Sequence, residues 1–129
     1  MVNYHLKEDD DKDIAFAVSC LFCQCLTLDE FKVWLENIIR ESDVDDIPSY
    51  IFDLLDFDGP LADIFSIIGF DPIWPFDDKA ENALYGISYK RNTVIIEDFG
   101  LSRKESEELL NKYPEVDFYF RKLFDFISF

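Results

Sequence analysis

The sequence contains no lysine or arginine between Arg40 and Lys79. These 38 residues carry eleven carboxylates, whereas the other 91 residues carry 17 acids and 12 bases. Like charges at this density repel one another and attract a partner of opposite sign, so the segment bears on association and not on fold. It is also rich in isoleucine, leucine and phenylalanine. We therefore expect a folded acidic surface, unlike a solvated acidic tail.

Residues that support catalysis are also scarce. His5 is the single histidine, which leaves no Ser–His or Cys–His pair to act as nucleophile and base. The four glycines are scattered and form no phosphate-binding loop. Carboxylate pairs are common among 28 acids, so a pair has almost no specificity as a hydrolytic site. We expect no catalytic residues and no enzyme. A small carboxylate-based hydrolase is kept as the least favoured alternative.

Cysteine is limited to Cys20, Cys23 and Cys25, all within the apolar residues 14–26. Cys20 and Cys23 have the C-x-x-C spacing that is found in metal and redox sites. A structural zinc ion needs four ligands, however, and the only histidine lies far away in the sequence. Inside an apolar helix, cysteine behaves as a small core residue. We expect three reduced thiols in the core, no metal and no cofactor.

Long hydrophobic runs are missing as well. The longest, residues 14–26, has 13 residues and is too short to span a bilayer. The first residues turn acidic at positions 8–11, unlike the basic start of a secretory signal. A pI near 4.1 argues against direct binding to nucleic acid or to an anionic membrane. We expect a cytoplasmic protein.

Hydrophobic periodicity predicts a mainly α-helical fold. We expect a single domain over residues 1–129, a compact bundle of about seven short helices with at most one brief strand pair, and a mobile segment over residues 1–11. The strand-forming composition is that of residues 93–96. The central apolar helix is predicted over residues 12–26, and later helices are predicted to begin near Thr27, Asp46, Pro60, Lys79, Ser102 and Pro114.

Two further features concern the ends of these helices. Thr27 with Glu30 and Ser102 with Glu105 have the spacing of a capping box, in which each side chain binds the other residue's backbone N–H. Gly69 is predicted to end the helix that starts near Pro60, because glycine adopts the left-handed conformation that terminates helices.

The two tryptophans have different predicted roles. Trp34 follows Phe31 by one helical turn and is expected to be half-buried. Trp74 and Phe76 lie in an irregular, proline-containing acidic loop. Two interpretations of this loop stay open: its rings cover the core, or they anchor a partner, since tryptophan is enriched at binding hot spots.

One segment has the sequence Ala83-Leu84-Tyr85-Gly86-Ile87 and continues with Tyr89 and Arg91. It resembles a segment of small bacterial immunity proteins, which neutralise the toxin domains of contact-dependent growth inhibition and related systems. The size, acidity and helical pattern of the chain are similar too. The resemblance implies a cytosolic antidote that binds its cognate toxin, often a nuclease, and occludes the toxin's active site.

The first hypothesis is therefore an immunity protein whose acidic surface docks on a basic toxin domain, with no direct nucleic-acid or membrane contact. The alternative is an acidic nucleic-acid mimic or adaptor that binds a host DNA-binding protein. The acidic residues could also serve only to keep the protein surface solvated, without binding a partner. The candidate partner-binding residues are Asp43, Asp45, Asp46, Asp53, Asp56, Asp58, Asp71, Trp74, Phe76, Asp77 and Asp78.

Overall fold

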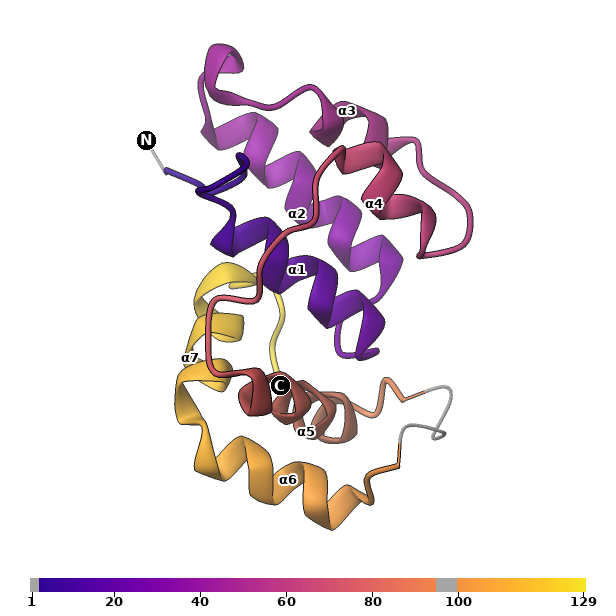
Figure 1. Cartoon of the computed structure of the whole chain (residues 1–129), viewed down its shortest axis with the longest axis vertical. Helices are drawn as coiled ribbons and strands as arrows, with labels where there is room; N and C mark the ends of the chain where they lie inside the picture. Colours follow the sequence, from indigo (N-terminus) through magenta and orange to yellow (C-terminus); the bar gives the residue numbers. More distant parts are fainter. Residues whose placement is uncertain (1–2, 95–99) are drawn as a thin grey trace.

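The computed structural model describes residues 3–94 and 100–129, and its described part consists of helices without a β-strand (Figure 1). This confirms the predicted mainly α, compact single-domain bundle. Part of the strand-prone run, residues 95–96, lies outside the described residues. The seven α-helices are α1 (Lys12–Phe22), α2 (Leu28–Glu41), α3 (Tyr50–Leu55), α4 (Asp63–Ile68), α5 (Ala83–Arg91), α6 (Arg103–Lys112) and α7 (Pro114–Leu123). Two short 3-10 helices are η1 (Val44–Asp46) and η2 (Asp78–Asn82).

Helix α1 is the centre of the molecule. Figure 1 shows it between α2, α3 and α4 on one side and α5, α6 and α7 on the other. Its residues Ile14, Phe16 and Cys20 are completely buried, as expected of a helix that is apolar on nearly all sides. The helix ends at Phe22 and not at Leu26, because Gln24 adopts a left-handed backbone conformation with φ of 65°. The chain then turns directly into α2.

Both predicted capping boxes are present. The Thr27 side chain accepts a hydrogen bond from Glu30 N at 3.1 Å, and the Glu30 carboxylate accepts one from Thr27 N at 3.0 Å. Ser102 and Glu105 form the same pair of bonds at the start of α6. Gly69 ends α4 with φ of 88°, as predicted. These bonds satisfy backbone groups that have no partner inside a helix.

The helices of the acidic region are shorter than predicted. Asp46 does not cap α3, because it lies in η1 and α3 begins only at Tyr50. The residue before a proline avoids the helical conformation, and Ile47, before Pro48, is extended with φ of −93° and ψ of 116°. Residues 60–62 likewise form a turn before α4, and η2 precedes α5.

Residues 3–11 of the N-terminal segment pack against the core, and the mobility expected of residues 1–11 stays a prediction. The side chain of Leu6 is 3% exposed, and its carbonyl oxygen accepts a hydrogen bond from the Tyr50 hydroxyl. The Tyr4 ring meets the edge of Trp34 with ring centroids 6.2 Å apart. Trp34 itself is 1% exposed, so the prediction that it is half-buried is wrong. The rings of Tyr4, Phe31 and Phe124 all pack against it, which explains the difference.

Candidate partner-binding surface

The acidic segment, residues 41–78, forms η1, α3, α4 and the α4–η2 loop (residues 69–77), which crosses α1 to reach η2 and α5 (Figure 1). All nine aspartates predicted to bind a partner are exposed and make no ion pair with a described residue. We call these nine residues the acidic face: Asp43, Asp45, Asp46, Asp53, Asp56, Asp58, Asp71, Asp77 and Asp78. Their charge is therefore not neutralised within the described part of the chain.

The acidic face is extended and does not form one compact cluster. Asp43, Asp45 and Asp46 belong to η1 and its start, which Figure 1 shows at one end of the molecule. Asp77 and Asp78 lie at the start of η2, beyond the loop that crosses α1. A partner that contacts all nine residues must therefore reach from η1 along α3 and α4 and across α1 to η2.

The N-terminal turn adds carboxylates that the sequence prediction missed. Asp10 lines a small hollow of about 140 Å³ together with Asp43 and Asp46, and Lys7 lies there as well. Asp11 Oδ2 accepts a hydrogen bond from Ile73 N in the α4–η2 loop, at 3.2 Å. The four consecutive acids at positions 8–11 were the available indication.

The charge of the molecule is unevenly distributed between its two halves. Residues 79–129 hold eight of the twelve basic residues against nine acids, so this region is close to neutral. It forms α5, α6 and α7, on the opposite side of α1 from α3 and α4 (Figure 1). The resulting field favours one orientation of a basic partner, with its cationic surface toward the α3–α4 half.

Trp74 and Phe76 cover the core. The Trp74 ring stacks on Phe16 of α1 with centroids 5.5 Å apart and an interplanar angle of 13°. Phe76 meets the edges of Phe16 and Tyr119 at 6.3 and 5.6 Å. Trp74 Nε1 donates to the carbonyl oxygen of Asp77 at 2.9 Å. These contacts favour the core-covering interpretation of the two rings over the anchoring one.

Other apolar side chains are more exposed than these two rings. Phe22, at the end of α1, and Phe65, on α4, are 41% and 36% exposed and stack on each other. Ile73, in the α4–η2 loop, is 71% exposed. The helical pattern places Phe65 on the inner side of its helix with Ile64, which is wrong, and Phe22 falls within the apolar run of residues 14–26. Their exposure depends on where α1 ends and on where α4 places Phe65 beside it.

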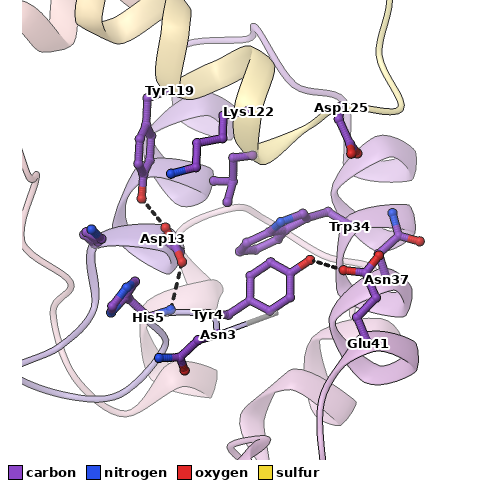
Figure 2. A pocket seen from close by; sticks show the side chains of 12 residues that line it. Asn3, Tyr4, His5, Asp13, Trp34, Asn37, Glu41, Tyr119, Lys122 and Asp125 are labelled. Carbon is purple, nitrogen blue, oxygen red and sulfur yellow. Dashed lines mark hydrogen bonds between the residues drawn. The ribbon is translucent and has the colours of Figure 1, made fainter. Parts of the chain in front are cut away.

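A separate pocket of about 290 Å³ lies between the N-terminal segment, α1, α2 and α7, with Trp34 in one wall (Figure 2). Its buried carboxylate, Asp13, accepts hydrogen bonds from His5 N at 2.8 Å and from the Tyr119 hydroxyl. The Tyr4 hydroxyl donates to Glu41 at 2.7 Å. These pairs bind the N-terminal segment to α1 and α2, and α7 to α1. We assign them a structural role, since no nucleophile lies beside a base among them.

The cysteines belong to the core, as predicted. Cys20 and Cys25 are completely buried and Cys23 is 5% exposed. Burial raises the pKa of the Cys20 and Cys23 thiols, because the low-dielectric interior disfavours the thiolate. Among residues 3–94 and 100–129, no three His, Cys, Asp or Glu side chains are grouped so that they could hold a metal ion.

In the same residues, no helix is both long and apolar enough to cross a membrane.

Comparison with known proteins identifies no matching family model, no similar curated protein and no similar solved structure. Charge, exposure and packing are therefore the observations from which a function can be inferred.

Proposed function

We propose that the protein is a cytoplasmic immunity protein, which binds a cognate bacterial toxin domain with a basic surface and neutralises it. The observation that carries this proposal is the acidic face: nine exposed aspartates in a folded segment that has no lysine or arginine. A surface selected only for solubility normally mixes charges of both signs. Thirty-eight residues of one sign favour recognition of a cationic partner.

The proposed mechanism is competition for the toxin's cationic groups. A nuclease grips the phosphates of its substrate with lysine and arginine side chains. Carboxylates of the acidic face would pair with those groups and cover the active site or the substrate-binding surface. Long-range attraction raises the association rate and weakens as salt is added. The protein itself would perform no chemistry.

The resemblance of residues 83–91 to immunity proteins supports the same proposal, although most of those residues pack inside the bundle. Ala83, Leu84, Gly86, Ile87 and Tyr89 of α5 are all buried. The resembling residues therefore describe the packing of α5 and do not identify the binding surface. The binding surface is inferred from charge.

Co-expression with the product of the adjacent upstream reading frame tests the proposal. We expect that product to arrest growth when expressed alone, to be harmless when this protein is present, and to co-purify with it. Cleavage of RNA or DNA by the purified product, inhibited at a one-to-one ratio, would identify the activity. The proposal fails if the neighbouring product is not toxic, or if its toxicity persists in the presence of this protein.

A nucleic-acid mimic or adaptor would behave differently in the same experiment. It would bind several host DNA-binding proteins with similar affinity, because its recognition depends on charge alone. An immunity protein should bind one partner far more tightly than any other. Turnover of a generic ester or phosphoester substrate by the purified protein would instead support the carboxylate hydrolase.

A further inference from the structure

A cleft of about 410 Å³ opens between the two halves of the molecule, beside the exposed phenylalanine pair. One wall is α1, the second is α4 with the α4–η2 loop, and the third is η2 with α5. The lining is mostly apolar or aromatic and consists of Ala15, Val18, Ser19, Phe22, Cys23, Phe65, Pro72, Trp74, Glu81 and Tyr85. We call it the Phe22–Phe65 cleft.

The two phenylalanines keep a large apolar area in solvent. Their rings are stacked with centroids 5.5 Å apart and an interplanar angle of 17°, so they form one flat edge of the cleft. They come from helices distant in the sequence, and each remains more than a third exposed. Apolar surface that is contiguous and rimmed by polar residues marks an interaction site more often than an isolated exposed side chain does.

The cleft holds one carboxylate, and the elements that form it carry further acids. Glu81 is among its lining residues, and its carboxylate accepts a hydrogen bond from the Ser19 hydroxyl at 3.1 Å. Asp63 begins the helix that carries Phe65, and Asp71 immediately precedes the lining residue Pro72. No lysine or arginine is among the lining residues. The cleft thus combines a mostly apolar lining with one carboxylate, and two of its walls, α4 and the α4–η2 loop, come from residues 41–78, which carry no lysine or arginine.

We infer that the Phe22–Phe65 cleft receives one apolar side chain of the basic partner, flanked on the partner's surface by lysine or arginine. This inference rests on the proposed function and specifies its contact. Charge supplies the argument for that occupant: cations on the partner would meet Glu81 and the base-free walls of the cleft while the apolar side chain covers the two rings. A second copy of this chain, with a net charge of −16, would bring the same acids to the same cleft and be repelled.

The two parts of the surface then have separable kinetic effects. Exposed charges of the acidic face act before contact and change the association rate. An apolar side chain seated in the cleft acts after contact and changes the dissociation rate. Truncation of a buried aromatic anchor at an interface typically weakens binding about tenfold or more.

The test uses a displayed library of random nine-residue peptides, which does not require the toxin to be known. We expect enrichment of peptides in which a leucine, isoleucine or aromatic residue lies between lysines or arginines. Phe22→Ser and Phe65→Ser should each lower the affinity for such a peptide about tenfold or more. Phe118→Ser is the matched control, since Phe118 is 70% exposed on α7 and does not line the cleft. Circular dichroism verifies the fold of each variant. If one of the two cleft variants does not fold, the other is enough for the test.

Two results would overturn the inference and leave the immunity proposal standing. The first is the absence of enrichment, or enrichment of peptides that bind the Phe65→Ser variant equally well. The second is a dimer in sedimentation experiments that Phe65→Ser dissociates, because the cleft would then belong to a second copy of the chain. Failure of the immunity proposal is seen separately, in the co-expression experiment.

Discussion

The guanidinium of Arg91, at the end of α5, holds the carboxylate of Glu30 in the first turn of α2. Arg91 Nη1 lies 3.0 Å from Glu30 Oε1, and Nη2 binds Oε2. Nη1 also donates to the carbonyl oxygen of Cys25 at 2.6 Å. The side chains of Arg91 and Glu30 are only 10% and 24% exposed. This ion pair fastens the α5–α7 half to the α1–α2 turn, so Arg91 has a structural role.

Replacing the arginine should loosen this connection. We expect Arg91→Met to lower the free energy of unfolding by about 2 kcal/mol, because it leaves a partly buried carboxylate and the Cys25 carbonyl without their charged donor. Urea denaturation measures the change. Arg103→Met is the control, since Arg103 and Glu107 form an exposed pair on α6 with an expected contribution of less than about 0.5 kcal/mol. Equal effects of the two substitutions would contradict the structural role of Arg91.

The same ion pair should make stability depend on pH. Burial alone raises the pKa of the Glu30 carboxyl, but hydrogen bonds from Arg91 and Thr27 and attraction to Arg91 outweigh burial and lower it below 4.5. A lowered folded-state pKa stabilises the protein above the ordinary glutamate pKa, and this stability is lost as the pH falls through the folded-state value. We expect the stability difference between the wild type and Glu30→Gln to be constant near neutral pH and to shrink below about 4.5. A difference that does not change with pH would contradict the assignment.

Helices α5 and α6 approach each other closely at Gly86. A Cβ atom built at this position would lie 2.5 Å from the carbonyl oxygen of Ser106 and 2.8 Å from the Leu110 Cβ, which forces the helices apart. We expect Gly86→Ala to destabilise the protein by about 1–3 kcal/mol in thermal or urea unfolding. Gly59→Ala should be nearly neutral, because the closest atom to its Cβ would be 3.6 Å away. The close helix contact would be in doubt if the two substitutions cost the same.

The parts of the fold that depend on neighbouring residues were predictable from the sequence. The capping boxes at Thr27 and Ser102 and the glycine at position 69 involve residues within one helical turn, so their spacing identifies them. The apolar character of α1 likewise indicated a central helix with its cysteines in the core. Local chemistry decides these features.

The parts that depend on distant contacts were not predictable. Nothing near Leu6 indicates that Tyr50 binds its carbonyl oxygen, a contact across 44 positions that fixes the N-terminal segment. The sequence does not distinguish whether Trp74 anchors a partner or covers the core; its stacking on Phe16 favours the second role. The exposure of Phe22 and Phe65 follows from the same tertiary arrangement. The charge of a surface can be predicted from the sequence, whereas its exposed apolar residues can be identified only once the fold is known.

The buried cysteines should be unreactive in the native protein. Burial raises the pKa of the Cys20 and Cys23 thiols, so little of the nucleophilic thiolate forms at mildly alkaline pH. We expect a disulfide reagent such as dithiobis(nitrobenzoate) to label no thiol rapidly in the folded protein and all three in guanidinium. Rapid native labelling of Cys23, which is 5% exposed, would indicate local opening of the turn after α1.

Charge reversal on α3 provides the test of the acidic face. Asp53 and Asp56 are exposed, and neither pairs with a described residue, so Asp53→Lys with Asp56→Lys should leave the fold intact. We expect the doubly substituted protein to associate with the toxic neighbouring product about tenfold more slowly at low salt, with a smaller difference at high salt. Surface plasmon resonance measures both rates, and the dissociation rate should change little because it depends on the apolar contact. Glu108→Lys with Glu115→Lys makes the same change of charge on exposed positions of α6 and α7. If both double variants slow association equally, only net charge matters, and an unchanged rate for the α3 variant would move the interface away from the acidic face.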